Sequence, residues 1–139
     1  MIKIYSKINK KNLVANILRF KEIKKKRINL SPEKEFLQMS AQSLKSNMTV
    51  RAHMHKKIIR KTNITQEVWI IFKGKVMAYI FDLNQKIIKK TILKKGDCLI
   101  LFRGGHGFKN LNKNSMLYEI KSGPYFGKEK DSREISYAI

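Results

Sequence analysis

The sequence has almost no cysteine and no long apolar run. Cys98 is the only cysteine among 139 residues, so no intrachain disulfide can form, and its place in an apolar run predicts a buried thiol. No apolar run reaches the roughly 20 residues that a membrane-spanning helix needs. The first residues lack the apolar stretch of a secretory signal, which predicts a cytoplasmic protein.

Acidic residues are also few. The 10 Asp and Glu stand against 31 Lys and Arg, which gives a formal net charge of +21. This excess indicates an anionic partner (a nucleic acid, a membrane surface or a phosphorylated small molecule) or a bias toward AT-rich codons, because Lys, Ile and Asn are abundant together. The lysine runs carry few aromatic side chains, which disfavours nucleic-acid binding. The basic run 24–27 is expected to be a solvated loop, or else a phosphate or membrane contact.

The length of the chain predicts one domain with two parts. Residues 1–30 are expected to form a basic extension with a short amphipathic helix over residues 11–23, where apolar residues recur at helical spacing. Residues 31–139 are expected to form an all-β barrel that is closed at one end by a C-terminal tail.

Short apolar stretches alternate with Gly, Asn and Asp turns from residue 36 onward, which predicts a series of β-strands. The expected strands cover residues 36–44, 48–55, 67–72, 75–81, 86–93, 98–102, 106–111 and 116–121. Strands this short and evenly spaced indicate a sandwich or a barrel. The open edges of such sheets predict a homodimer, formed through edge strands or by exchange of the N-terminal extension as an arm.

The 3 histidines of the chain form two groups, and each group lies in or beside an expected strand. His53 and His55 are two residues apart on an expected strand, so their imidazoles project to the same face. Glu67 begins the next expected strand, and His106 follows a Gly-Gly turn. Three imidazoles and one carboxylate suit a borderline divalent ion, which predicts a site for Fe(II), Mn(II), Zn(II), Ni(II) or Co(II). Such a site keeps coordination positions open for a small, polar or anionic ligand.

Several other side chains are candidates for the walls of a ligand pocket. Arg51 and Arg103 flank the histidine groups and could clamp a carboxylate or a phosphate. The aromatic candidates are Trp69, Tyr79, Phe108 and Tyr118. The same residues also fit a plainer interpretation, in which the arginines are solvated and the aromatic rings fill the core.

The spacing of the histidines, the glutamate and the glycines resembles the two motifs of the cupin superfamily. The residues that carry this resemblance are His53, His55, Glu67 and Gly74 in the first motif, and Gly96, Gly104, His106 and Asn110 in the second. The stretch between His55 and Glu67 is longer than in the family pattern, and Phe102 replaces a proline. The resemblance implies a jelly-roll fold, also called a double-stranded β-helix, that holds one metal ion through three His and one Glu.

Five further strings are similar to small bacterial cupins that are often encoded among genes for cell-surface polysaccharide synthesis. They are Thr65-Gln66-Glu67, Lys73-Gly74-Lys75-Val76, Leu93-Lys94-Lys95-Gly96-Asp97, Gly104-Gly105-His106-Gly107 and Lys121-Ser122-Gly123-Pro124-Tyr125-Phe126-Gly127. This resemblance implies a sugar-like or nucleotide-sugar ligand and a metal-dependent isomerase, epimerase or oxygenase-type reaction. The shortage of acid–base side chains also fits a non-catalytic metalloprotein that binds or senses a ligand. Nucleic-acid binding through the basic surface is a minor alternative.

Overall fold

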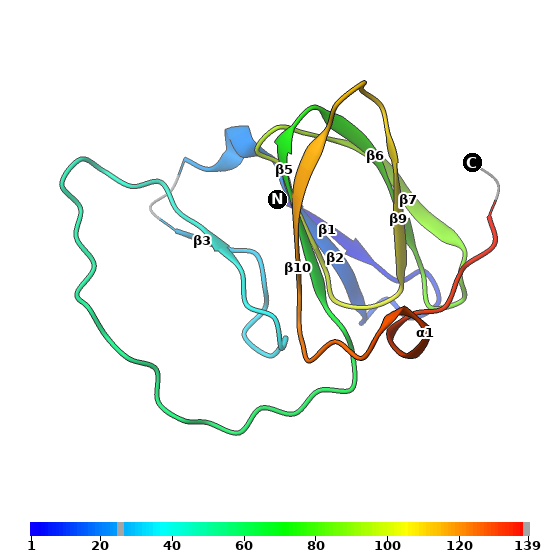
Figure 1. Ribbon diagram of the computed structural model, residues 1–139, viewed down its shortest axis with the longest axis horizontal. Helices are drawn as coiled ribbons and strands as arrows, with labels where there is room; N and C mark the ends of the chain where they lie inside the picture. Colours follow the sequence, from blue (N-terminus) through cyan, green and yellow to red (C-terminus); the bar gives the residue numbers. More distant parts are fainter. Residues whose placement is uncertain (25–26, 138–139) are drawn as a thin grey trace.

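The computed structural model describes residues 1–24 and 27–137, and these residues are organised almost entirely as antiparallel strands (Figure 1). The prediction of an all-β chain is confirmed. The strands are β1 (Ile2–Tyr5), β2 (Leu13–Leu18), β3 (Ile28–Asn29), β4 (Ser40–Ala41), β5 (Glu67–Lys73), β6 (Lys75–Phe81), β7 (Ile87–Lys94), β8 (Cys98–Leu101), β9 (Gly105–Asn110) and β10 (Met116–Lys121). The described residues also form two short helices, the 3-10 turn η1 (Phe20–Glu22) and α1 (Lys128–Asp131). No helix in the described residues is long and apolar enough to cross a membrane.

Two sheets pack face to face. The larger has the order β1-β2-β8-β5-β10, the smaller has the order β7-β6-β9, and β3 pairs only with β4. Among the described strands none bridges β9 to β10, so the two sheets form an open sandwich and the closed barrel predicted from the sequence is not formed. Residues 111–115 carry the chain from β9 in one sheet to β10 in the other, and these two strands do not pair.

The space between the sheets is filled by alternate residues of the paired strands. Trp69 and Ile71 from β5 meet Ala78 and Ile80 from β6, and all four are buried. Side chains two apart on a strand share a face, so the residues between them point to the outer surfaces. Each strand therefore contributes one set of side chains to this core and a second set to the outside of the molecule.

The prediction of a helix over residues 11–23 is wrong, because strand β2 runs through the middle of this range and only the short 3-10 turn η1 follows it. Every residue of β2 is buried. One face of the strand joins the core between the sheets, and the other lies under Leu30 and its neighbours. A strand buried on both faces reads as a continuous apolar run, and such a run cannot be told from a helix by periodicity alone. Strands β1 and β2 thus belong to the larger sheet, although residues 1–30 were expected to form an extension outside the barrel.

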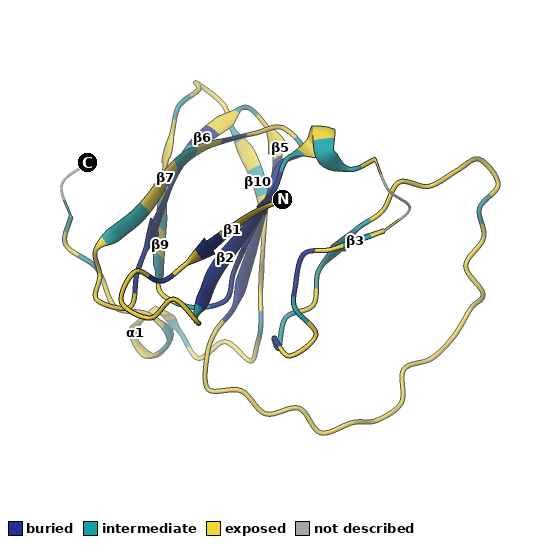
Figure 2. Cartoon of the chain, turned by 180° about the vertical axis from the view of Figure 1, so that it is seen from behind, coloured by how far each residue is buried: buried dark blue, intermediate teal, exposed yellow. Residues whose placement is uncertain are grey.

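A hairpin-like arm, residues 28–41, covers the outer face of the larger sheet (Figure 2). The strand predicted over residues 36–44 is reduced to β4, because most of this stretch turns to pack its side chains on the sheet. Arg103 pairs with the buried Glu35 of the arm at 2.9 Å, and Gln66 donates to Glu35 at 2.6 Å. These bonds satisfy the carboxylate and fix the arm to the sandwich. In the basic run 24–27, residues 25–26 lie outside the described part of the chain.

The next stretch, residues 42–65, projects beyond the sheets and is called the projecting segment below (Figures 1 and 2). All of its residues except Met48 are exposed. The strand predicted over residues 48–55 is not formed here, although the sequence alternates as a strand should. A strand needs a neighbour to accept its backbone hydrogen bonds, and the projecting segment has no such neighbour within the described chain.

The lone thiol lies where the sequence predicted it. Cys98 begins β8, and its residue is 5% exposed. Burial, together with the negative charge of Asp97, raises the pKa of the thiol to about 11. Cys98 is therefore a structural side chain of the core.

Candidate ligand site between β9 and β10

Strands β9 and β10 are free edges of the two sheets. Several polar side chains that face the space between the sheets lie near these two strands. Ile80 and Ala78 face the core, and they are directly paired with His106 and Phe108 of β9, so these two side chains also face inward. Glu67 shares the inner face of β5 with the core residue Trp69. Elements far apart in the sequence therefore bring one carboxylate and one imidazole together, as predicted for this pair.

The carboxylate of Glu67 is the centre of the candidate site. Its oxygen Oε2 lies 3.3 Å from His106 Nε2 and 3.5 Å from Lys121 Nζ, while Oε1 accepts a hydrogen bond from the indole N–H of Trp69. The Glu67 side chain is only 5% exposed, whereas those of His106 and Lys121 are 33% and 41% exposed. The carboxylate is thus buried, and its two partners, His106 and Lys121, reach toward solvent.

Electrostatics keep Glu67 ionised. Burial acts to raise the pKa of its carboxyl, but the hydrogen bonds from His106 and Trp69 and the charge of Lys121 outweigh burial and hold the pKa below its usual value. On the other side of the pair, a hydrogen bond to Glu119 at 2.9 Å and the charge of Glu67 raise the pKa of Lys121. The site therefore presents one anion flanked by a persistent cation at neutral pH.

Aromatic rings line one side of this polar group. The ring of Trp69 meets those of His106 and Phe108 edge to face, each at a centroid distance of 5.3 Å. Trp69 is 2% exposed and Phe108 is 46% exposed, so the indole forms the base of the site and the phenyl ring stands at its rim. The sequence predicted both of these aromatic residues as pocket walls.

His53 and His55 lie elsewhere. Both belong to the projecting segment and are exposed, with their rings 5.3 Å apart, and His53 Nδ1 is 3.0 Å from the backbone oxygen of Arg51. The chain thus brings together two of the four predicted metal ligands and leaves the other pair, together with Arg51, away from the sandwich (Figure 1). Over residues 1–24 and 27–137, no three His, Cys, Asp or Glu side chains are grouped as a metal site requires.

Two of the aromatic pocket candidates face the outside. Tyr79 is buried, but on the outer face of β6, where Tyr137 of the C-terminal tail covers it at a ring distance of 5.5 Å. Tyr118 is 59% exposed and contacts Phe72 on the outer face of the larger sheet at 5.8 Å. Both rings therefore lie on outer faces of their sheets, away from Glu67 and His106. A single strand sequence does not reveal which of its two faces turns inward.

Arg103 has a structural role that the sequence did not predict. Its guanidinium donates to both oxygens of Glu35, at 2.9 and 3.0 Å, and to the backbone oxygen of Leu13. These contacts use the planar fork of the guanidinium to hold the arm. The guanidinium of Arg103 is therefore directed at the arm and at strand β2.

Lys121 is a site residue that the sequence analysis missed. It closes β10 and lies on the same inward face as Leu117 and Glu119. The sequence of residues 116–121 could have revealed Lys121. Glu119 and Lys121 are two and four residues after Leu117, so they lie on the face that Leu117 turns toward the core. The abundance of lysine in the chain hid it.

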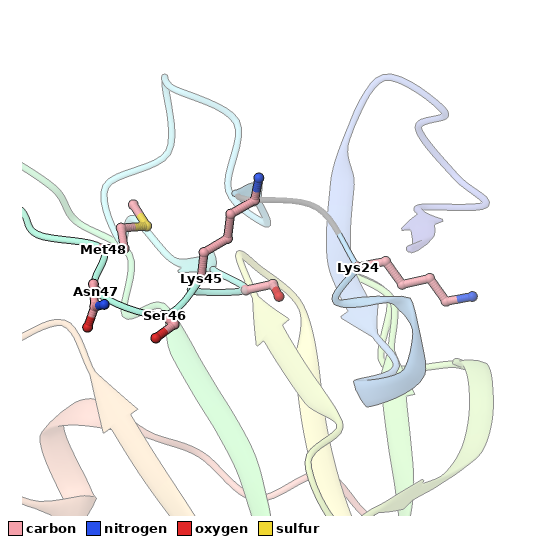
Figure 3. A pocket seen from close by; sticks show the side chains of 6 residues that line it. Lys24, Lys45, Ser46, Asn47 and Met48 are labelled. Carbon is pink, nitrogen blue, oxygen red and sulfur yellow. The ribbon is translucent and has the colours of Figure 1, made fainter.

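Two surface hollows lie outside this site. One, of about 380 Å³, is lined by Lys24 and by residues of the projecting segment, among them Lys45, Asn47 and Met48 (Figure 3). The other, of about 440 Å³, lies beside Met1, Glu22 and Ile28. Neither contains a buried polar group comparable to Glu67, so neither is a better candidate for a ligand site than the residues between β9 and β10.

Comparison with protein-family profiles, curated proteins and solved structures finds no match to this chain.

Proposed function

We propose that this protein binds a small, polar, sugar-like ligand between β9 and β10. The observation that carries the proposal is the convergence of His106 and Lys121 on one buried oxygen of Glu67, beside the rings of Trp69 and Phe108. A few fixed polar groups beside aromatic side chains are typical of the residues that bind small molecules.

The chemistry of these side chains suits a polyhydroxylated ligand. An ionised carboxylate accepts hydrogen bonds from hydroxyl groups, and an ammonium group donates to ring or hydroxyl oxygens. The exposed face of Phe108 offers an apolar surface to the C–H side of a sugar ring. Lys121 and the +21 charge of the chain favour a ligand that also carries a phosphate or a carboxylate, as a nucleotide-sugar does.

Bound metal is a separate prediction. Glu67 and His106 provide two donors of the types that divalent ions such as Zn(II) or Fe(II) accept, but a resident ion needs three or four protein donors. His53 and His55 do not reach this pair within one chain. The four-ligand set of the cupin resemblance therefore does not fit the single chain, and ligand binding is proposed here without any step that depends on a metal.

A catalytic role is the second candidate function. The observation that favours it is the 3.3 Å contact between Glu67 and His106, because a carboxylate that orients an imidazole can support proton transfer to a bound ligand. Isomerisation or epimerisation of a sugar requires such a transfer. The site offers no second carboxylate–imidazole pair in the described residues, which makes binding the simpler proposal.

A cytoplasmic location stays a prediction.

Binding can be measured by calorimetry against a panel of sugar phosphates, nucleotide-sugars and free sugars. We expect one class to bind, and we expect Glu67→Gln to weaken that binding at least tenfold because the neutral amide no longer attracts Lys121 and His106. Glu33→Gln is the matched control, since Glu33 is an exposed residue of the arm. Equal loss in both variants, or unchanged affinity in Glu67→Gln, would remove the proposed site. Binding of single-stranded DNA with a steep salt dependence would favour the nucleic-acid alternative instead.

A further inference from the structure

Strand β10 has an uncovered edge. It is the last strand of the larger sheet and pairs only with β5. Its outward-facing residues Tyr118 and Ile120 are 59% and 47% exposed, and the neighbouring Phe72 of β5 is 54% exposed. An open strand edge beside an apolar surface is a template for another strand. Nothing in the described part of the chain pairs with this edge.

The projecting segment contains a stretch with the sequence of such a strand. Over residues 48–55 the apolar side chains are Met48, Val50, Ala52 and Met54, and the polar ones between them are Thr49, Arg51, His53 and His55. Val50 and Met54 are 68% and 94% exposed. Strict alternation over eight residues is typical of a half-buried strand, so the sequence of this stretch and its solvated state disagree.

Residues 48–55 and strand β10 match when their apolar side chains lie on the same side of the sheet. Residues opposite one another on neighbouring strands point to the same side of a sheet. When the apolar set of residues 48–55 lies beside Tyr118 and Ile120, the polar set faces the side of Glu119 and Lys121, where Glu67 also lies. A slip by one residue would place the polar set beside Tyr118 and Ile120 and turn the apolar set toward Glu119 and Lys121, so the register parity is fixed. Arg51 then faces the same side as Glu119, which gives opposite charges across the pair.

We propose that residues 48–55 of one copy of the chain add as a strand to the free edge of β10 in a second copy. The projecting segment extends away from the sheets in both views (Figures 1 and 2), so no strand in the described part of its own chain pairs with this stretch. Because each copy has one such segment and one β10 edge, two copies satisfy both through a closed two-fold exchange. The exchange covers Val50, Met54, Tyr118 and Ile120 at once.

The exchange also completes the site. The partner's His53 and the partner's His55 enter on the same side as Glu67 and His106, so a second copy supplies the two imidazoles that a single chain does not bring together. Three imidazoles and one carboxylate form a donor set for a borderline divalent cation. This part of the proposal rests on the function proposed above, since it assigns a cation to the same site. The strand exchange itself stands on the edge, the alternation and the exposed apolar residues.

Light scattering during gel filtration tests the exchange. We expect a particle of twice the 16.3 kDa chain mass. Val50→Lys and Tyr118→Lys each place a charge in the apolar face of the new strand pair, one on each strand, and each should weaken dimerisation at least tenfold. Ile8→Lys changes a side chain that is 58% exposed and far from β10 in sequence, and this variant should stay dimeric. A wild-type monomer, or a dimer that all three variants leave intact, overturns the proposal.

A complementation experiment tests whether the site spans two copies. One copy carries His53→Ala with His55→Ala, the other carries Glu67→Gln with His106→Asn, and different tags isolate the mixed dimer. With Zn(II) alone as the probe, we expect neither parent dimer to bind tightly and the mixed dimer to recover one ion per dimer. Binding by wild type without recovery in the mixed dimer shows that each site forms within one chain and overturns the exchange. A wild-type dimer that binds no Zn(II) removes the cation but leaves the exchange to be judged by the Val50 and Tyr118 variants.

Discussion

The arm and the projecting segment follow one another along the chain, contain little regular structure, and have opposite fates. The arm packs on the larger sheet with Leu30 fully buried and Glu35 only 6% exposed. The projecting segment has comparable apolar residues, yet Met54 and Ile59 are 94% and 86% exposed. Its six Lys and Arg have no acidic residue among them. Apolar side chains are therefore not enough to dock a segment. The arm docks because its polar groups also find partners on the sheet, as Glu35 does in Arg103 and Gln66.

The largest effect is expected when the polar anchor of the arm is removed. Arg103→Met leaves the Glu35 carboxylate buried without its cation, which should lower the free energy of unfolding by about 3–5 kcal/mol. Urea denaturation measures this change. Arg51→Met alters an exposed arginine of the projecting segment and should stay within about 0.5 kcal/mol of wild type. Similar losses in the two variants would show that the arm does not depend on this pair.

The apolar contacts of the two regions should differ in the same direction. Leu30→Ala opens a cavity under the arm and should cost about 2–4 kcal/mol, because the Leu30 side chain is fully buried. Ile59→Ala removes an exposed side chain and should change stability by less than about 0.5 kcal/mol. Thermal and urea unfolding of both variants provide the comparison. A large loss in Ile59→Ala would mean that this part of the projecting segment is packed in solution.

A smaller effect is expected at Glu67 and depends on pH. Its pKa in the folded state lies below its ordinary value, so the ionised carboxylate stabilises the fold above the usual glutamate pKa of about 4.3. This contribution is lost as pH falls through the lowered pKa. Glu67→Gln keeps a hydrogen-bond acceptor for Trp69 but removes the titration, and should cost about 1–3 kcal/mol at pH 7.

Urea unfolding at pH 7 and at pH 3 checks this expectation. Wild type should lose more stability between the two conditions than Glu67→Gln does. Glu33→Gln, in which an exposed carboxylate is replaced, should keep the wild-type pH dependence. An identical pH dependence in wild type and Glu67→Gln would show that Glu67 has no favourable partners.

The smallest perturbation is a single cut in the backbone. Trypsin should cleave the projecting segment first, at Lys57, Arg60 or Lys61, because these residues are exposed and lie outside both the sheets and residues 48–55. Lys34 of the arm should be cut later, since the arm is held by Glu35 and Leu30. Mass spectrometry of early fragments gives the order. Earlier cleavage at Lys34 would reverse the comparison between the two regions.

The strands that the sequence predicted well are those with a turn at each end. The predicted ranges 75–81 and 116–121 coincide with β6 and β10, because a glycine or an asparagine loop marks their limits and their side chains alternate. The strand β2 was hidden since it is buried on both faces and looks like part of a helix. The alternation of residues 48–55 was recognised, but alternation does not reveal whether a partner strand is available.

The candidate site could be predicted in part for a related reason. Glu67, Trp69, His106 and Phe108 converge because their strands pair in the registers that their apolar neighbours require. Tyr79 could not be assigned from the sequence, because a tail residue more than fifty positions later, Tyr137, decides which face of its strand is covered. The place of His53 and His55 depends on contacts between distant parts of the chain, or of two chains. Local sequence does not encode such contacts.

The burial of Cys98 makes the natural chain a convenient background for spectroscopic probes. With a pKa near 11, this sulfur is reactive in only about one molecule in ten thousand at neutral pH. A cysteine introduced at an exposed position, such as Ser43 in the projecting segment, would therefore take a maleimide dye or a spin label selectively. Distances between labels could then be recorded in solution without first removing a native thiol.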